Sequence, residues 1–309
     1  MTTPKTKKKT LEQVLKKGKP LTYNEIKLLT GLTKKSFNIK LGDLKDGGIP
    51  IKAYVDQNTY VTYFYLQKGP MMSNQVYNVD LNDGEYLLGV YGDTHVGDKG
   101  YDHNAHLKYY DMLDDRGCEL VMHAGDLITG VSIYSNQHVD LNIHTKMEQA
   151  EWYVDNCPEL SKGETLIIDG NHDTKNMEKS FSPGYFIGDR KSNHRYLGQI
   201  AADVRLASNL TARLIHLKGR AYAKSYTLQK YIRGLAPVGM PNMIFKGHSH
   251  DSIYMNVQGI ECLHTSTLQH GISNFAKELG FQDEIGAWII TYEIENSKLK
   301  RFVPELIRF

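Results

Sequence analysis

Short apolar runs that end in a polar motif recur along the chain after residue 84. Five such runs are rich in β-branched or aromatic residues, which predicts strands, and helix-like stretches such as 103–117 and 144–156 lie between them. Strands that alternate with helices predict an α/β architecture, in which side chains at the carboxyl ends of strands meet in one crevice. The polar residues that follow the five runs are Asp93 and His95, Asp126, Asn171 with His172 and Asp173, His216, and His248 with His250.

The first 70 residues follow a different pattern. Three helices and a two-stranded ribbon are expected there, and this combination resembles a winged helix-turn-helix domain, whose third helix enters the DNA major groove. The expected helices are 10–18, 24–29 and 33–44, and the expected strands are 49–55 and 59–66, joined by a turn at 56–58. The candidate DNA-binding residues on the third helix are Lys34, Lys35, Asn38 and Lys40.

A linker is expected between these two modules. Residues 67–84 lose the hydrophobic periodicity and gather Gly, Pro, Ser and Asn. The expected organisation is therefore a small winged helix-turn-helix domain at 1–70, a linker at 71–84 and a larger α/β domain at 85–309.

Charge separates the two modules sharply. Residues 1–70 contain 14 Lys, no Arg and five acidic residues, a net charge of +9, whereas the rest of the chain carries −7. A basic module fused to an acidic one favours binding of a polyanion such as DNA. Because bidentate contacts to guanine favour Arg, a module with Lys alone is expected to contact phosphates without reading bases. The alternative is a module that binds a protein partner and whose lysines are merely solvated.

The composition is that of a globular protein, with 40% hydrophobic and 23% charged residues among 309. No apolar run approaches the roughly 20 residues needed to span a bilayer, so no membrane partner is expected. The basic N-terminus lacks the apolar segment of a secretory signal. Cys118, Cys157 and Cys262 have no CxxC spacing and are too few for a disulfide framework, which favours a cytoplasmic location.

The polar residues at the five strand ends form a mixed nitrogen and oxygen ligand set without thiolate. Such a set suits Mn²⁺, Fe or Zn²⁺ better than Mg²⁺ or Ca²⁺. Seven candidates are too many for one tetrahedral zinc but fit two metals that share a carboxylate. Two divalent ions about 3.5–4 Å apart can bind phosphate oxygens and activate a hydroxide for in-line displacement at phosphorus. We therefore expect two divalent ions, Mn²⁺ first among them.

The five motifs together resemble the signatures of calcineurin-like metallophosphoesterases, in the same order and over about residues 85–265. In this sequence they are Gly-Asp93-Thr-His95, Gly-Asp126, Gly-Asn171-His172-Asp173, His216 and Gly-His248-Ser-His250. The resemblance implies a four-layer αββα sandwich. It also implies that the late segments 258–269 and 286–295 are strands of the second sheet.

The resemblance also implies a role for each residue. Asp126 would bridge the two metals, His172 would be the catalytic histidine, and Asp173 would orient His172. The remaining ligands would divide into Asp93, His95 and His250 at one metal and Asn171, His216 and His248 at the other. By the residue pattern alone His123, within a strand, is expected to be a hydrogen-bonded core residue.

The segment between the last two motifs predicts one more helix. Residues 221–234 have amphipathic spacing, which would place Lys224, Tyr226 and Lys230 near the crevice. These side chains are expected either to contact a substrate phosphate or to be ordinary surface residues of a packed helix.

The motifs exclude some classes of substrate but do not identify one. Serine/threonine protein phosphatases of this superfamily carry an Arg after the second motif, and this chain lacks it. The opening motif resembles Mre11/SbcD-type nucleases and the small subunit of archaeal DNA polymerase D. Those nucleases, however, place a second catalytic His where this chain has Thr129.

Three hypotheses follow from these observations. The leading one is a phosphoesterase acting on DNA, either a nuclease or a DNA-end phosphatase, because the metal motifs are fused to a basic module. The second is a phosphatase or cyclic-nucleotide phosphodiesterase for small molecules or proteins, with the winged helix binding a partner. The third is a DNA-binding scaffold whose metal site has lapsed. By resemblance, a homodimer and an ATPase or a replication or repair protein are candidate partners.

Overall fold

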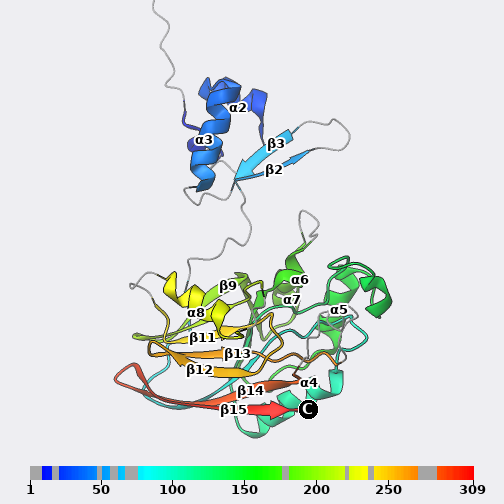
Figure 1. Ribbon diagram of the computed structural model, residues 1–309, viewed down its shortest axis with the longest axis vertical. Coiled ribbons are helices and arrows are strands. Elements are labelled where there is room, and N and C mark those ends of the chain that lie inside the picture. The colour runs from blue at the N-terminus through cyan, green and yellow to red at the C-terminus, as the bar shows by residue number, and fades with distance from the viewer. Residues whose placement is uncertain are drawn as a thin grey trace, which may run out of the picture. The chain divides into compact units, whose positions relative to one another are not determined.

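The computed structural model divides into two compact units, Met1–Met71 and Met72–Phe309 (Figure 1). The residues that it describes are 9–15, 21–46, 51–55, 62–66, 76–175, 181–219, 223–235, 240–270 and 284–309. The turn expected at 56–58 therefore lies outside the described residues.

The first unit packs three helices and a small antiparallel sheet, in the strand order β1-β3-β2. Its elements are α1 (Leu11–Leu15), β1 (Leu21–Thr22), α2 (Tyr23–Thr30), α3 (Lys34–Asp46), β2 (Ile51–Val55) and β3 (Thr62–Leu66). Its core consists of Leu11, Val14, Leu15, Ile26 and Phe37, all at most 2% exposed.

Local capping explains where the helices of this unit begin and end. The expected cap Thr22 is confirmed: its hydroxyl accepts from the amide of Glu25, whose carboxylate accepts from the amide of Thr22. This capping box pairs two amides that would otherwise be unsatisfied at the helix start. Gly31 ends α2 in the left-handed conformation (φ 73°), which favours glycine. Thr33 accepts from the amide of Ser36 and caps α3, as expected.

The second unit contains two mixed six-stranded sheets, which confirms the α/β class. One sheet has the order β15-β14-β5-β6-β7-β8, and the other has the order β12-β13-β11-β10-β9-β4. The strands of the first sheet are β5 (Gly84–Tyr91), β6 (Leu120–His123), β7 (Glu164–Asp169), β8 (His194–Gln199), β14 (Gly286–Glu295) and β15 (Lys298–Arg308). Those of the second sheet are β4 (Tyr77–Asn78), β9 (Ala201–Ala207), β10 (Leu210–Ile215), β11 (Met243–Lys246), β12 (Ile253–Val257) and β13 (Ile260–His264).

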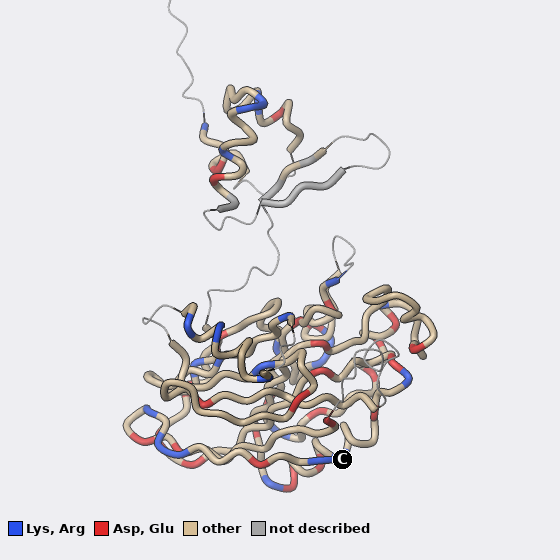
Figure 2. The backbone as a smooth tube through the Cα atoms, viewed as in Figure 1, with Lys and Arg blue, Asp and Glu red and all other residues tan. Residues whose placement is uncertain are grey.

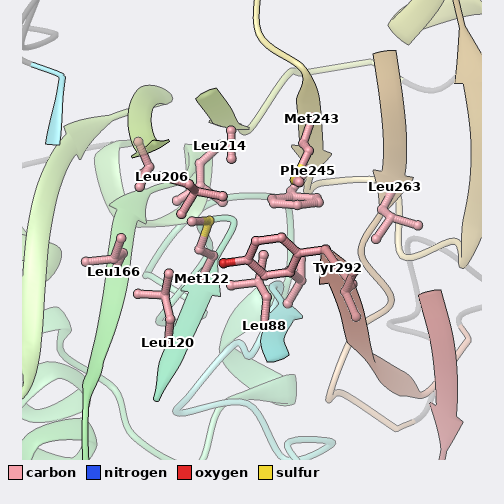
Figure 3. Packing of buried hydrophobic residues seen from close by; sticks show 14 of the residues in the cluster. Leu88, Leu120, Met122, Leu166, Leu206, Leu214, Met243, Phe245, Leu263 and Tyr292 are labelled. Carbon is pink, nitrogen blue, oxygen red and sulfur yellow. The ribbon is translucent and has the colours of Figure 1, made fainter. Parts of the chain in front are cut away.

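The two sheets share one apolar core (Figure 3). Leu88, Met122 and Tyr292 from one sheet pack with Leu214 and Phe245 from the other, and all are at most 1% exposed. Their alternation along the strands buries one face of each sheet in this layer.

Helices cover the opposite face of each sheet. They are α4 (His103–Asp115), α5 (Lys146–Asn156), α7 (Pro183–Arg190) and α8 (Tyr226–Arg233), with two short turns, η1 (Gln137–Asp140) and α6 (Asn171–Thr174). Helices α4, α5 and α7 pack on the sheet that contains β5–β8. Helix α8 packs on the other sheet through Leu228 and Ile232. The order of layers is helix, sheet, sheet, helix. Among the described helices, none is long and apolar enough to cross a membrane.

Two expectations about strand placement need correction. The segments 258–269 and 286–295 were both expected in the second sheet, but β13 and β14 lie in different sheets. β14 forms a hairpin with β15, and its other neighbour is β5, which pairs antiparallel with it from some 200 residues earlier, a pairing that no local pattern reveals. Within the expected linker, Tyr77 and Asn78 pair in parallel with β9. A two-residue strand is too short to give a periodic signal.

Candidate metal centre

The expected ligands lie directly after strands of both sheets. β5, β6 and β7 lead to Asp93, Asp126 and Asn171, whereas β10 and β11 lead to His216 and His248. Because β5, β6 and β7 are parallel to one another, and β10 is parallel to β11, each set delivers its ligands at one sheet edge. The centre is therefore built between the two sheets rather than at the edge of one.

The backbone at these ligands adopts an uncommon conformation. Positive φ angles occur at Asp93 (52°), His95 (52°), Asp126 (56°), His248 (84°) and His250 (54°). The left-handed region is unfavourable for residues other than glycine and is concentrated at functional sites. Loops in this conformation need surrounding contacts to hold them.

Gly125 permits the close approach of three of these loops. Its φ is 92°, and a Cβ at this position would meet Nδ1 of His216 at 2.7 Å and Cα of Gly170 at 2.9 Å. Glycine is therefore required where the loops after β6, β7 and β10 converge.

One group of possible metal ligands consists of Asp93, His95 and His250. Nε2 of His250 lies 3.4 Å from Oδ1 of Asp93 and 3.1 Å from Nε2 of His95. Asp93 is 0% exposed, and its carboxylate accepts the amide of His248 at 3.0 and 2.9 Å. The arrangement directs two imidazole nitrogens and a carboxylate oxygen at one point.

A second group consists of Asp126, His216 and His248, and Asp126 also forms a third group with His95 and His172. Nε2 of His216 lies 3.2 Å from Oδ2 of Asp126 and 3.2 Å from Oδ1 of Asn171. Asp126 is thus shared between groups, as a bridging carboxylate requires. The structure brings all seven expected ligands together.

Hydrogen bonds leave the ligand atoms available. Nδ1 of His216 donates to the carbonyl oxygen of Ala124 at 2.7 Å, so Nε2 presents its lone pair to the centre in the neutral ring. Oδ1 of Asp126 accepts the amide of His172 at 2.8 Å, which leaves Oδ2 directed at the histidines. Ionised carboxylates and neutral imidazoles of this kind fit divalent cations.

Burial and charge set the protonation of the histidines. Burial lowers the pKa of His248 to about 3, so its imidazole is neutral at pH 7. Burial acts in the same direction on His216, but the carboxylate of Asp126 outweighs it and raises the pKa of His216 to about 9. Burial also lowers the pKa of His172 below its ordinary value. Of His216 and His248, only His216 would therefore have to lose a proton before it could bind a metal.

The role expected for Asp173 needs correction. Nδ1 of His172 donates to the carbonyl oxygen of Thr129 at 2.8 Å, so it is Thr129 that orients the ring. The carboxylate of Asp173 instead accepts three backbone amides, from Gly170 at 2.6 Å, Ile128 at 3.0 Å and Leu127 at 3.2 Å. Asp173 joins the loop after β6 to the loop after β7, and through them it positions Asp126 and Asn171.

Three polar side chains near the centre, Gln137, Gln149 and Lys146, were not predicted from the sequence. Nε2 of Gln137 donates to the Thr129 carbonyl at 3.0 Å, and the carboxamide of Gln149 both accepts from and donates to Gly130. Nζ of Lys146 donates to the carbonyl oxygens of His172 at 3.0 Å and Asp173 at 2.9 Å. Their partners lie 8 to 27 residues away, so no local motif could have identified them.

His123 is a hydrogen-bonded core residue, as expected. It is 0% exposed, its Nδ1 accepts the amide of Gly125, and its Nε2 contacts the hydroxyl of Thr94 at 2.6 Å. The candidate residues of the first unit, Lys34, Lys35, Asn38 and Lys40, all lie exposed on α3.

Comparison with known sequences finds one curated relative with a partial match. No protein-family profile matches the chain. The DNA polymerase II small subunit of Pyrococcus furiosus is 29% identical over 126 residues, which are 37% of this chain and 20% of that protein. The match thus spans about a fifth of the length of that relative.

Several solved structures have a similar fold at low sequence identity. An archaeal phosphodiesterase is 15% identical with a TM-score of 0.41, covering 72% of this chain and 99% of its own. Zinc-bound Vps29 from Entamoeba histolytica is 15% identical with a TM-score of 0.39, covering 71% and 98%. Vps29 from Chaetomium thermophilum is 13% identical with a TM-score of 0.39, covering 72% and 93%.

Removing the shared carboxylate should remove metal but not the fold. Asp126→Asn is expected to lower bound Mn²⁺ after dialysis from about two ions per chain to fewer than one, because both groups lose their common anionic ligand. The metal-free variant should fold, because asparagine tolerates a left-handed backbone, but it should melt below the metal-free wild type, because it loses the buried ion pair with protonated His216. Elemental analysis and thermal melting measure both. Asp115→Asn, at an exposed acid, is the matched control; full retention of metal in Asp126→Asn would contradict the assignment.

Metal binding should release protons at neutral pH. With a pKa of about 9, His216 is protonated in the metal-free centre at pH 7 and loses that proton when it binds a metal. We expect about one proton released per chain at pH 7 and almost none at pH 10. Titration calorimetry in buffers of different ionisation enthalpy measures this number, and equal release at both pH values would contradict it.

Proposed function

We propose that this protein is a metal-dependent phosphoesterase of the calcineurin-like type, with two divalent ions, Mn²⁺ first among the candidates. The observation that carries the proposal is the convergence of six nitrogen and oxygen ligands around a seventh, the shared buried carboxylate of Asp126. Burying two ionised carboxylates without compensation costs several kcal/mol each, which bound cations offset. No thiolate belongs to the set, as expected for hydrolysis at phosphorus rather than for a structural zinc site.

Each ligand has a place in this proposal. The first ion is assigned to Asp93, His95 and His250, the second to Asn171, His216 and His248, and Asp126 to both. The bound ions would supply Lewis acidity and lower the pKa of a coordinated water. The chain contributes rigid placement, because the loops after β6, β7 and β11 are held by backbone amides donating to Asp93, Asp126 or Asp173.

His172 is the proposed proton carrier. Its Nδ1 is engaged by the Thr129 carbonyl, so Nε2 is the free position, 3.9 Å from Oδ2 of Asp126. The side chain is 18% exposed, whereas Asp126 is 1% exposed, so His172 lies at the open side of the centre. Nε2 can accept a proton during attack on the ester and return it to the leaving oxygen.

DNA is the proposed substrate. The protein would either cleave the strand, as a nuclease, or remove a phosphate from a strand end, as a DNA-end phosphatase. Support comes from the +9 charge of residues 1–70 and from the exposed Lys34, Lys35, Asn38 and Lys40 of α3. We propose that the first unit is a winged helix-turn-helix that binds DNA phosphates. The partial likeness to a DNA polymerase II small subunit favours the same substrate and a replication partner.

A second candidate is hydrolysis of small or protein phosphoesters, and one observation favours it. The position that carries a second histidine in related nucleases is Thr129, which is 1% exposed. A threonine hydroxyl does not titrate near neutral pH, so this position lacks the proton carrier that the histidine supplies in those nucleases. The first unit would then bind a protein partner.

A cleavage assay distinguishes the two candidates. With Mn²⁺, 5′- and 3′-labelled single- and double-stranded DNA are compared with bis-p-nitrophenyl phosphate. His172→Ala is expected to lower the rate on DNA about 10²- to 10⁴-fold, because it removes the proton carrier. His144→Ala, at an exposed histidine, is the matched control. DNA products that persist in His172→Ala would exclude its proposed role, and hydrolysis of the small ester alone would favour the second candidate.

The lysines of α3 provide a separate test of the first unit. Lys34→Ala/Lys35→Ala is expected to raise KM for DNA several-fold and to reduce the salt dependence of binding, because two phosphate contacts are lost. The charge-matched control is Lys108→Ala/Lys162→Ala, at exposed lysines of the second unit. Equal KM values for the two double variants would remove α3 from the DNA-binding surface.

A further inference from the structure

The second unit contains a long basic segment within an otherwise acidic region. Residues 204–250 include eight Lys and Arg and no Asp or Glu. The other residues of 71–309 include 15 basic and 30 acidic side chains. Protein surfaces ordinarily mix positive and negative side chains. A stretch of 47 residues with eight basic and no acidic side chains is therefore unusual and suggests a function for the positive charge.

Helix α8 presents part of this charge on one face. Leu228 and Ile232 are 0% exposed against the sheet, whereas Tyr226 is 56% exposed and Lys230 and Arg233 are exposed. The spacing of four and three residues places the last three on one side of the helix, over about 10 Å. Figure 2 shows basic positions along this helix.

Among the residues that the structure describes, Lys218, Lys230 and Arg233 have no ion-pair partner. By contrast, Arg213 in the same segment is paired with Asp203 at 2.5 Å. Structural pairing therefore accounts for Arg213 and for Lys224, which pairs with Asp251, but not for Lys218, Lys230 and Arg233.

The start of the basic helix is connected to the metal centre by the chain and by one ion pair. The segment leaves the centre at His216, and Lys218 follows two residues later on the surface. Before α8 begins, Nζ of Lys224 donates to Oδ1 of Asp251 at 2.6 Å, and Asp251 directly follows the ligand His250. The start of α8 is thus tied to a ligand loop, and Tyr226 lies at that end of the helix.

We propose that Tyr226, Lys230 and Arg233 form a track that binds single-stranded nucleic acid and leads it to the metal centre. The two cations bind successive phosphates, and the exposed ring of Tyr226 stacks on a base, the combination by which proteins bind single strands without sequence preference. The inference rests on the proposed function in one respect, that the same strand supplies the bond to be cleaved.

An anionic membrane is a poorer fit for this face. A helix that lies in a membrane interface inserts an apolar face beneath its cations. The apolar face of α8, formed by Leu228 and Ile232, is already buried against the sheet. Tyr226 is the one large apolar side chain of α8 that is substantially exposed, too little to insert into a membrane.

Charge reversal on the full chain tests the track. Lys230→Glu/Arg233→Glu is compared with Lys162→Glu/Lys298→Glu, which makes the same charge change at exposed lysines on other elements. Binding of a fluorescein-labelled 20-nucleotide single strand is followed by anisotropy in EDTA, so that no cleavage occurs. We expect a Kd at least tenfold higher in the α8 variant and a salt slope lower by about 1.4, from two lost phosphate contacts. The control should match the wild type, and thermal melting checks that both variants fold.

Photocrosslinking reports on α8 directly, even if the first unit also binds the strand and dominates the measured Kd. A strand containing 5-iodouracil is irradiated with the wild-type chain, and tryptic peptides are analysed by mass spectrometry. An adduct on peptide 225–230 is expected, at Tyr226, and Tyr226→Leu should abolish it. Adducts elsewhere with none on this peptide would overturn the track, as would binding of phosphatidylserine vesicles that the strand does not displace.

The outcomes separate this inference from the proposed function. Weaker binding in the α8 variant, with neither cleavage nor end dephosphorylation of DNA by the wild type, would support the track and refute the nuclease or DNA-end phosphatase. DNA cleavage by the wild type, with unchanged binding in the α8 variant and no adduct at Tyr226, would refute the track and leave the proposed function standing.

Discussion

The facing carboxylates of Asp93 and Asp126 are the constraint on which the second unit depends. Both are almost fully buried, and an ionised carboxylate taken out of water loses several kcal/mol of solvation even after the protein relaxes. Imidazoles on the loops after β5, β7, β10 and β11 face them. The protonated His216 offsets only part of the negative charge, and neutral imidazoles such as His248 supply ligand atoms but no charge. Divalent cations would satisfy both requirements at once, which is why a metal centre is the natural interpretation of this interior.

Backbone amides hold the centre together more than side-chain contacts do. The carboxylate of Asp93 accepts the amide of His248 from the other sheet, and Asp126 accepts the amide of His172. Asp173 accepts three amides from two loops. Acidic residues therefore act twice, as ligands toward the interior and as acceptors that fix the loops. This double use explains how strained loops from two sheets are kept at fixed separations.

The sequence predicted that these side chains would meet in one place because they follow strands closely, and strand, motif and helix are local patterns. It could not predict contacts that depend on packing over long separations. The Thr129 carbonyl orients His172 from 43 residues away, and the carboxamide of Gln137 approaches the same carbonyl from an inserted turn. The sequence could not predict which sheet contains β14 either. Its partner β5 lies some 200 residues earlier in the chain, and the apolar alternation of β14 is compatible with either sheet.

The left-handed backbone at the ligands also bears on how such proteins diverge. Aspartate and asparagine both tolerate this conformation, unlike most residues with a Cβ. A single exchange of one for the other at Asp126 would keep the loop, its hydrogen bond to the amide of His172 and the surrounding packing, while deleting the shared charge. Descendants of such a gene could lose hydrolysis and retain the complete architecture, leaving selection free to keep the scaffold for binding alone.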